Sequence, residues 1–333
     1  MPADEAGVAR AVAALHAGRL VAFPTETVYG LGGLARDAAA VEAIYRLKGR
    51  PSGHPLIVHL PAGAALDSWF DPVPPAAGRL AADFWPGPLT IVARRANHVP
   101  ELVSGGHATV ALRCPGHLVA AALLDALADG VAAPSANRFG RISPTRAEHV
   151  ADEFPDEDLL ILDGGPCALG LESTILDLSG AEPRLLRPGA ITRAQLEQSL
   201  GRAITLAGVS DRDAPPAPGR LETHYAPTAP VRLVSAAALP RTAGPADALL
   251  LRTAMTPPGT QAPVVRLPAD PAGYACGLYD ALRRLDAGGP AGIVIERPPD
   301  EECWSAVLDR LGRAAGPRGD GPPRQAKGSE EQT

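Results

Sequence analysis

The apolar positions of this chain follow two alternating patterns, a helical period of about 3.6 residues and short apolar runs typical of strands. Val8, Val12 and Leu15 recur at helical spacing and predict a helix over residues 5–17. The run RLVAF at residues 19–23 follows directly and predicts a strand. The chain therefore begins with a helix that leads into a strand.

The next helix has a clear beginning and end in the sequence. It is predicted over residues 37–49, with Asp37 as its N-cap and Gly49 just past its last turn. The same two patterns continue to residue 206 and predict an α/β fold with mixed strand directions. The further helices are expected at about 76–84, 117–128 and 192–200, and the further strands at 55–60, 88–94, 108–113, 129–133, 159–163, 173–179 and 183–187.

A change in composition divides the chain. From residue 207 to residue 230, Pro, Gly and charged residues replace the apolar periodicity, which predicts an interdomain linker. The α/β pattern then restarts, with strands expected at 231–235, 248–252, 263–267 and 292–297 and helices at about 273–286 and 301–313. The predicted division is a first domain over 1–206, a linker over 207–230, a small C-terminal α/β domain over 231–315 and a disordered tail over 316–333.

Composition and charge limit the class of protein. The 333 residues are 46% hydrophobic, enough to bury two cores, and 31 basic against 37 acidic residues give a net charge of −6. An acidic total argues against a broad nucleic-acid footprint but leaves room for a local basic pocket. The cysteines form no C-x-x-C pair, the N-terminus has no targeting pattern, and no long apolar run occurs, so we expect a soluble cytoplasmic protein with reduced thiols.

Common catalytic signatures are missing from the sequence. It contains no G-x-x-x-x-G-K-[ST] phosphate loop, no G-x-S-x-G elbow and no H-E-x-x-H motif. GLGGLA at residues 30–35 lacks the G-x-G-x-x-G spacing of a dinucleotide fingerprint and is not interpreted as one. The sequence also presents no general base and no set of metal ligands.

Polar motifs follow the predicted strands instead. They are PTETVYGLG, KGRPSGHPLIVH, ALRCPGH, APSANRFGRISPT, GLESTI and LLRPG. Just after apolar strands, where open α/β sheets usually gather a ligand, they place Arg113, Ser135, Asn137, Ser143, Ser173, Thr174 and Arg187. Cations and hydroxyls without paired carboxylates suit an anionic substrate such as a triphosphate.

Each motif also has a plainer interpretation. Lys48 and Arg50 alone fit a solvated helix end near the negative pole of the helix dipole. Ser135 and Asn137 fit a turn, and His59 fits a hydrogen-bonded core histidine. A different class of function is an RNA-binding module without catalysis, in which a concave surface holds the phosphates of tRNA or double-stranded RNA with Lys48, Arg50, Arg138 and Arg141. The acidic total argues against that class.

Together and in this order, the motifs resemble those of the YrdC-type threonylcarbamoyl-AMP synthases. The K-x-R of Lys48 and Arg50 and the S-x-N of Ser135 and Asn137 are the mark of that family. The resemblance spans most of residues 8–200, and PGRLETHYAP resembles the linker of the longer, two-domain members. It implies a YrdC-like open twisted mixed sheet with a large pocket, followed by a smaller Rossmann-like α/β domain.

The resemblance also implies a reaction. The family condenses L-threonine, bicarbonate and ATP into threonylcarbamoyl-AMP and pyrophosphate, and a separate threonylcarbamoyl transferase complex then modifies an adenosine of tRNA. For this chain it implies a nucleotidyltransferase that uses ATP with Mg²⁺ and meets tRNA only indirectly, in the cytoplasm and not at a membrane. The related carbamoyl transferases of hydrogenase maturation carry extra zinc-binding cysteines, which this chain lacks.

Roles for single residues follow from the resemblance. It assigns catalysis to Lys48 and Arg50, and the ATP site to Lys48, Arg50, Ser52, Thr109, Ser135, Asn137, Ser143 and Arg187. It assigns L-threonine to Thr25, His59, Arg113 and Ser173, with Tyr29 expected in the same cavity. Tyr225 of the linker is predicted to fold over the nucleotide and close the pocket against water. A metal ligand, an oligomeric state and a role for the C-terminal domain are not predicted.

Overall fold

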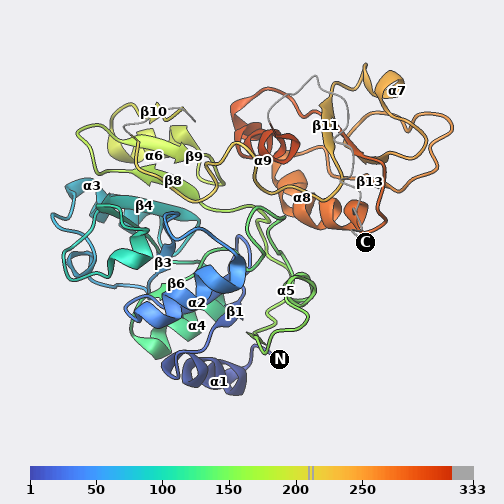
Figure 1. Ribbon diagram of the computed structural model, residues 1–333. Helices are drawn as coiled ribbons and strands as arrows, with labels where there is room; N and C mark the ends of the chain where they lie inside the picture. Colours follow the sequence, from blue (N-terminus) through green and yellow to red (C-terminus); the bar gives the residue numbers. More distant parts are fainter. Residues whose placement is uncertain (209–210, 212–213, 317–333) are drawn as a thin grey trace, which may run out of the picture.

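The structure is a computed structural model, and it describes residues 1–208, 211 and 214–316. The predicted disordered tail lies outside the described residues from residue 317 onward. Two α/β units follow one another along the chain, and Figure 1 shows the second, in orange and red, beside the blue, green and yellow first unit. Helices α8 and α9 of the second unit lie at the junction between them.

The first unit is built on a ten-stranded sheet in the order β10-β9-β8-β4-β5-β3-β6-β2-β1-β7. The sheet contains parallel pairs, such as β3 with β5, and antiparallel pairs, such as β4 with β5. The predicted mixed sheet is therefore confirmed. Its strands are β1 Val21–Phe23, β2 Gly30–Leu34, β3 Ile57–His59, β4 Leu89–Arg94, β5 Thr109–Arg113, β6 Val131–Ala132, β7 Leu160–Ile161, β8 Thr174–Asp177, β9 Arg184–Arg187 and β10 Thr205–Leu206.

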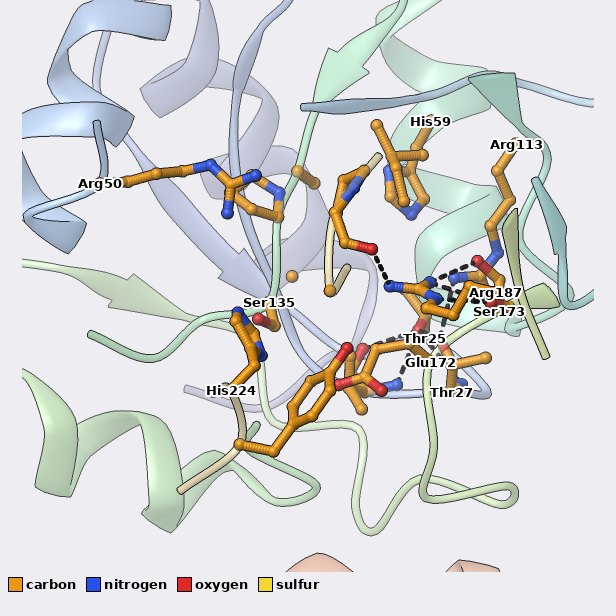
Figure 2. Close-up of a pocket in the computed structure, with 18 residues that line it drawn as sticks. Thr25, Thr27, Arg50, His59, Arg113, Ser135, Glu172, Ser173, Arg187 and His224 are labelled. Carbon is orange, nitrogen blue, oxygen red and sulfur yellow. Dashed lines mark hydrogen bonds between the residues drawn. The ribbon is translucent and has the colours of Figure 1, made fainter. Parts of the chain in front are cut away.

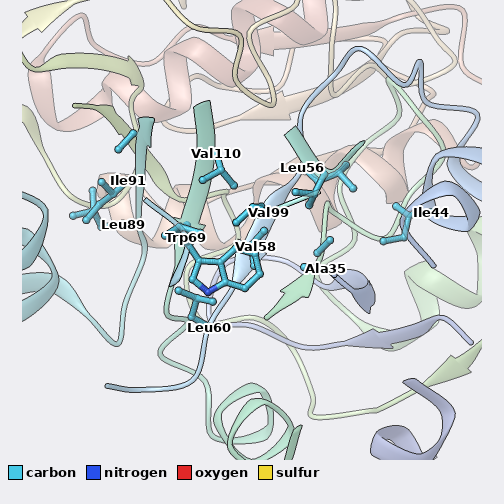
Figure 3. Packing of buried hydrophobic residues seen from close by; sticks show 14 of the residues in the cluster. Ala35, Ile44, Leu56, Val58, Leu60, Trp69, Leu89, Ile91, Val99 and Val110 are labelled. Carbon is cyan, nitrogen blue, oxygen red and sulfur yellow. The ribbon is translucent and has the colours of Figure 1, made fainter. Parts of the chain in front are cut away.

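Six α-helices accompany this sheet: α1 Glu5–His16, α2 Ala38–Lys48, α3 Pro75–Phe84, α4 Leu118–Leu127, α5 Ala147–Glu153 and α6 Arg193–Leu200. Short 3₁₀ turns cover Leu66–Ser68 and Glu101–Ser104. The main core packs along β3, β4 and β5, and Figure 3 shows Trp69, 3% exposed, against Val58 and Leu60. Burying such side chains stabilises the sheet whose edge carries the polar motifs.

Helix α2 begins and ends as predicted. The Asp37 carboxylate accepts hydrogen bonds from the amides of Ala39 and Ala40, and Gly49 adopts a left-handed conformation with a φ of 62°. Lys48 is therefore the last helical residue, and its side chain is buried. The plainer interpretation of Lys48 as a solvated residue at a helix end is therefore wrong.

The GLGGLA segment was not predicted as an element, but it forms the buried strand β2 between β1 and β6. A Cβ on Gly32 would lie 2.8 Å from the Phe23 ring and 2.9 Å from Val131. The crowded interior selects glycine here against its low strand propensity. Three short elements, α5, β10 and α7, were also not predicted, because they contain too few residues to show a period.

The second unit carries a four-stranded sheet in the order β11-β14-β12-β13, parallel throughout, as the predicted Rossmann-like domain requires. Helices α8 and α9 pack on it through a buried cluster that includes Leu278, Leu282 and Leu311. Its elements are β11 Val231–Val234, α7 Leu239–Thr242, β12 Ala248–Leu251, β13 Val264–Arg266, α8 Pro271–Asp286, β14 Ile293–Glu296, a 3₁₀ turn at Glu302–Trp304 and α9 Ser305–Ala315. Within the described residues, no helix is both long and apolar enough to cross a membrane.

Candidate functional site

A pocket opens at the edge of the first sheet where β3, β5 and β9 end and β8 begins (Figure 2). It holds about 550 Å³ of empty space, part of it open to solvent. The first domain lines it with Thr25, Thr27, Val28, Gly30, Arg50, Ile57, His59, Arg113, Ala133, Pro134, Ser135, Glu172, Ser173 and Arg187, and the linker adds Pro218, Gly219, His224 and Tyr225. Chain segments that are far apart in sequence thus converge on one polar cavity.

Arg113 stands at the end of β5 and is 3% exposed. Its guanidinium donates to the Thr27 hydroxyl at 2.8 Å and to the Gly87 carbonyl at 3.3 Å, and it forms an ion pair with Glu26 at 2.7 Å. Burial would raise the pKa of Glu26, but the charge and hydrogen bond of Arg113 outweigh it, so the pKa is lowered. The pair holds the Arg113 guanidinium in place at the pocket wall.

Arg187, at the end of β9, is held by backbone carbonyls. It donates to the Ser173 carbonyl at 2.9 and 3.0 Å and to the Pro218 carbonyl at 3.0 Å. The Ser173 hydroxyl lies 3.2 Å from Arg187 and 2.7 Å from the Thr90 hydroxyl. Burial lowers the pKa of Arg187. Neutral carbonyls do not cancel a positive charge, so this wall is suited to an anion.

Arg50 follows α2 and borders both the pocket and a second hollow on the other side of the linker. It donates to the carbonyls of His54 at 3.1 Å and Pro55 at 2.8 Å, and its guanidinium lies 5.5 Å from the Phe139 ring centre. Burial lowers the pKa of Arg50 to about 10. Arg50 is thus a second cation with no carboxylate partner among the described residues.

Lys48 lies behind the pocket wall and does not line it. Its Nζ donates to the Ser135 carbonyl at 2.6 Å and the Asn137 carbonyl at 2.5 Å. Burial, assisted by the charge of Arg50, holds the pKa of Lys48 well below its ordinary value. Lys48 therefore ties the S-x-N segment to the end of α2.

His59 ends β3 and is 3% exposed. Its ring packs edge-on against Phe23 with the ring centres 6.2 Å apart, and Nδ1 has no hydrogen-bond partner among the described residues. Burial, and then the charge of Arg113, lowers the pKa of His59 to about 3. A neutral imidazole with an unpaired nitrogen in a pocket is placed to bind a ligand hydroxyl or amine.

Glu172 is the only carboxylate among the described residues that line this pocket. It accepts hydrogen bonds from Ser143 at 2.5 Å, Tyr279 at 2.9 Å and Arg310 at 2.8 Å. Burial opposes its charge, but Arg310, then Arg187 and the hydrogen bonds outweigh burial and lower its pKa to about 2. The carboxylate is charged and fully engaged by the protein.

The linker enters the pocket through His224 and Tyr225. The two rings lie 4.1 Å apart, His224 also faces Phe139 at 6.1 Å, and Tyr225 stacks on Tyr279 at 5.7 Å. The Tyr225 hydroxyl and His224 Nδ1 have no hydrogen-bond partner among the described residues. Burial, with help from nearby cations, lowers the pKa of His224 to about 3. The linker is therefore part of the site, not an exposed tether.

The structure brings most of the predicted residues together. Eight line the pocket, namely Thr25, Arg50, His59, Arg113, Ser135, Ser173, Arg187 and Tyr225. Three lie one layer behind it: Lys48, Asn137, which donates to the Arg138 and Arg141 carbonyls, and Ser143. Outside the wall lie Ser52, exposed after α2, Thr109, at the beginning of β5, Thr174, bonded to Ile191, and Tyr29, bonded to Gly165.

Two carboxylates of the site were not predicted from the sequence. The motifs indicated a cluster of cations without paired acids, whereas Glu26 pairs with Arg113 and Glu172 lines the pocket. Each stands in a motif that was quoted, Glu26 in PTETVYG and Glu172 in GLEST. The signal was their position one residue from Thr25 and Ser173. Within the described residues no three His, Cys, Asp or Glu side chains gather as metal ligands would.

Comparison with known proteins adds an independent finding. A family model described as "Telomere recombination" matches residues 13–189, and one described as "Threonylcarbamoyl-AMP synthase, C-terminal domain" matches residues 191–316. A protein of Bacillus subtilis named threonylcarbamoyl-AMP synthase is 39% identical over 93% of each chain. The solved structure of Pyrococcus abyssi Sua5 complexed with L-threonine is 35% identical, with a TM-score of 0.85 over 94% of this chain and 95% of that one.

Proposed function

The chain belongs to the threonylcarbamoyl-AMP synthase family, and we propose that it joins L-threonine, bicarbonate and ATP into threonylcarbamoyl-AMP and pyrophosphate. The pocket at the edge of the first sheet is the observation that carries the proposal. Buried Arg113 and Arg187 line this cavity together with His59, whose ring nitrogen Nδ1 has no hydrogen-bond partner among the described residues. The likeness over almost the whole chain to a protein solved with L-threonine supports the amino acid as one ligand.

L-threonine is assigned to the Arg113 side of the pocket. A guanidinium has five N–H donors, and three of those of Arg113 are directed at protein acceptors. Two donors are left for the carboxylate of the amino acid. His59 Nδ1 is suited to the threonine hydroxyl, because an unpaired buried nitrogen gains most from a ligand partner. Thr25 and Ser173 complete this side.

ATP is assigned to the other side, under the linker. Arg50, Arg187, Ser135 and Tyr225 line it, with Lys48, Asn137 and Ser143 behind them. An ammonium has three donors, and Lys48 uses two on carbonyls, so one is free for a phosphate oxygen. A phosphate also favours the charged form of Lys48, which burial disfavours. Ser52, in the loop after α2, and Thr109, at the beginning of β5, belong to the assignment only if both move toward the pocket.

The chemistry follows from this arrangement. The threonine amine adds to the carbon of bicarbonate, and one water leaves to give a carbamate. A carbamate oxygen then attacks the α-phosphorus of ATP as the bond to pyrophosphate breaks. Arg50 and Arg187, which line the pocket, and Lys48 behind its wall offset the negative charge that develops on the phosphoryl oxygens and on the leaving pyrophosphate. Because the carbamate is short-lived, holding it beside the α-phosphate is the main contribution of the protein.

Mg²⁺ enters this proposal with the triphosphate. The two carboxylates near the pocket do not fit a resident metal site, because Glu26 is paired with Arg113 and Glu172 with Arg310. The product is a mixed anhydride that water destroys, so a transferase complex must take it up before its threonylcarbamoyl group reaches tRNA. We place the protein in the cytoplasm, where tRNA is modified.

The linker is proposed to act as a lid. Tyr225 is 1% exposed, and its ring and that of His224 cover the ATP side. An aromatic cover excludes water from a product that hydrolyses readily. A solved Pyrococcus abyssi Sua5 variant, in which a histidine and the adjoining tyrosine are replaced by alanine, has a TM-score of 0.85 to this chain. The proposed lid thus lies in a His-Tyr segment like the one altered in that variant.

Pyrophosphate release tests the proposed reaction. The purified protein is supplied with ATP and Mg²⁺, with and without L-threonine and bicarbonate. We expect release only when both are present, and a product that decays to free AMP and threonine. Release with L-serine in place of threonine, or without bicarbonate, would overturn the assignment. Binding of tRNA with a steep salt dependence and no pyrophosphate release would support the RNA-binding alternative instead.

A further inference from the structure

The second domain reaches the pocket through one carboxylate, Glu172. Two of its three hydrogen-bond donors, Tyr279 on α8 and Arg310 on α9, come from that domain, and Ser143 comes from the first. Glu172 is 7% exposed and precedes Ser173 in the pocket wall. A contact between domains therefore controls a group that faces the cavity.

Arg310 is the centre of this contact, and its side chain is fully buried. It donates to the Glu172 carboxylate at 2.8 Å, to the Glu172 carbonyl at 3.3 Å and to the Pro188 carbonyl at 3.1 Å. Its guanidinium lies 5.4 Å from the centre of the Tyr225 ring, which also stacks on Tyr279. The same two side chains thus hold Glu172 and form the seat of the linker tyrosine.

Arg187 lies close enough for its charge to act on Glu172, yet no hydrogen bond joins the two in the described structure. The donors of Arg187 go to carbonyls of Ser173 and Pro218. A buried carboxylate deprived of its partner is unstable and takes the nearest cation. Without Arg310, that cation is Arg187.

We propose that Arg310 and Tyr279 are positioning residues of the reaction. They hold the charge of Glu172 away from Arg187, so that Arg187 faces the anionic substrate, and they seat Tyr225 over the pocket. This inference rests on the proposed function, which identifies the anion as the triphosphate of ATP. It gives the second domain a role at the first domain's pocket.

Kinetics test whether Arg310 keeps Glu172 from pairing with Arg187. Arg310→Gln is expected to raise the KM for ATP about tenfold, since Glu172 then pairs with Arg187 and removes a cation from the nucleotide. Glu172→Gln combined with Arg310→Gln should bring the KM back to within about threefold of the parent, because no carboxylate competes any longer. If the KM for ATP of the double variant is as high as that of Arg310→Gln alone, competition between Glu172 and the nucleotide for Arg187 is overturned.

A neighbouring residue supplies the matched control. Asp280 adjoins Tyr279 on α8 and also crosses the junction, to Arg146 at 3.3 Å and His149 at 3.4 Å, but it does not touch the pocket. Asp280→Asn should leave the KM for ATP unchanged. An equal rise in Asp280→Asn and Arg310→Gln would mean that any loosening of the junction suffices, which contradicts the proposal.

Amide exchange tests the seat without relying on activity. The His224 amide is bonded to the Arg313 carbonyl and the Ala226 amide to the Gly140 carbonyl. In the free protein, Arg310→Gln and Tyr279→Leu should speed exchange of these amides about tenfold, with Tyr279→Phe and Asp280→Asn near the parent. Unchanged exchange in both Arg310→Gln and Tyr279→Leu overturns the seat. If the parent releases no threonine-dependent pyrophosphate, the proposed function fails, and the exchange result still decides the seat.

Discussion

The two sheets of the molecule end in opposite ways. At the edge of the first sheet, His59, His224 and Tyr225 line a cavity, and each has a buried polar atom with no partner among the described residues. At the carboxyl edge of the second, the Glu296 carboxylate accepts hydrogen bonds from the amides of Arg252, Thr253 and Ala254 at 2.7 to 2.9 Å. The Thr253 hydroxyl adds another at 2.7 Å. One edge is open to a ligand, and the other is filled by the protein itself.

The difference between the two edges shows that a similar sheet architecture does not by itself imply a ligand site. The carboxyl edge of a parallel sheet is where open α/β folds usually bind ligands, and a cluster of backbone amides there is suited to an anion. Glu296 ends β14 and occupies this anion position as an internal ligand. In the second domain, the amides that could bind an anion are therefore occupied by Glu296 and stabilise the domain itself. Its proposed influence on the reaction is exerted through Arg310 and Tyr279 at the junction.

An arginine stands at each edge, which makes the comparison testable. Arg113→Gln removes the proposed partner of the threonine carboxylate and leaves Glu26 buried without its cation. We expect kcat/KM for threonine to fall at least about a hundredfold, which corresponds to roughly 3 kcal/mol. Arg252 also has a buried unpaired nitrogen, Nε, and its guanidinium lies 5.6 Å from the Trp304 ring centre.

Arg252→Gln is expected to leave kcat/KM unchanged, because Arg252 is remote from the pocket. Steady-state pyrophosphate release at varied threonine measures both variants. A comparable loss in the two would show that the second edge takes part in the reaction, and the contrast between open and filled edges would fail.

Glu296→Gln probes the filled edge. Glutamine keeps the size of the side chain, but it replaces an acceptor oxygen by an NH₂ group that faces backbone N–H donors. We expect a loss of about 2 kcal/mol in the stability of the second domain, since buried donors are left unsatisfied. Urea unfolding followed by amide exchange in α8 and α9 reports on that domain, because these helices pack in its core, whereas tryptophan fluorescence would also report Trp69 and Trp85 of the first domain. A transition at the parent's urea concentration would contradict the internal-anion interpretation.

Acid should weaken the open edge first. The pKa values of His59 and His224 are about 3 in the folded protein, below the ordinary 6.5, so both are neutral when folded and take up protons when unfolded. Their contribution to stability is full above pH 6.5 and declines toward pH 3, by about 1.4 kcal/mol per pH unit for each histidine. Glu26 and Glu172 have lowered pKa values and add losses only below about pH 4.5.

Between pH 6.5 and pH 4.5 the loss of stability therefore comes from the histidines and not from Glu26 or Glu172. His224→Asn should reduce the slope of stability against pH by about 1.4 kcal/mol per unit in this window. Denaturant unfolding of the parent and the variant at several pH values measures it. Parallel curves would mean that His224 is not kept neutral by the closed linker.

Local patterns predicted the elements better than the site. Asp37 and Gly49 bound α2 as expected, because caps act within a few residues. Strand β2 was not predicted, because its glycines are required by the close packing of Phe23 and Val131, which lie elsewhere in the sequence. Strand propensity depends on a residue and its neighbours in sequence, whereas the space available to a side chain is set by the tertiary fold.

The site shows the same limit. The quoted motifs converge on one pocket, since strand ends meet at one edge of a sheet. The states of the charges did not follow from the motifs. Lys48 is bound to two carbonyls, and Glu172 is bound by Arg310, which is 138 residues away in sequence. Partners brought together by folding decide which cations remain available to a ligand, and a linear motif does not contain them.

The smallest expected effect separates the lid from ordinary backbone strain. Gly219 and Gly259 both have a φ of +79°, so alanine at either position costs about 1 kcal/mol. A Cβ on Gly219 would lie 2.1 Å from the Tyr225 hydroxyl oxygen, whereas a Cβ on Gly259 would meet nothing within 4 Å. The Cβ on Gly219 would also lie 3.1 Å from Nη1 of Arg187, so the two substitutions share the strain and differ in the displacement of Tyr225 and the crowding of Arg187.

Gly219→Ala should therefore raise the KM for ATP several-fold, up to about tenfold, because the displaced Tyr225 ring no longer covers the nucleotide and the crowded Arg187 no longer faces it freely. Gly259→Ala should lower the melting temperature by a similar amount and leave the KM unchanged. Pyrophosphate release at varied ATP, with thermal unfolding of both variants, measures the difference. If the KM values agree while the melting temperatures fall together, Tyr225 is only a packing residue of the junction and the proposed lid has no part in holding ATP.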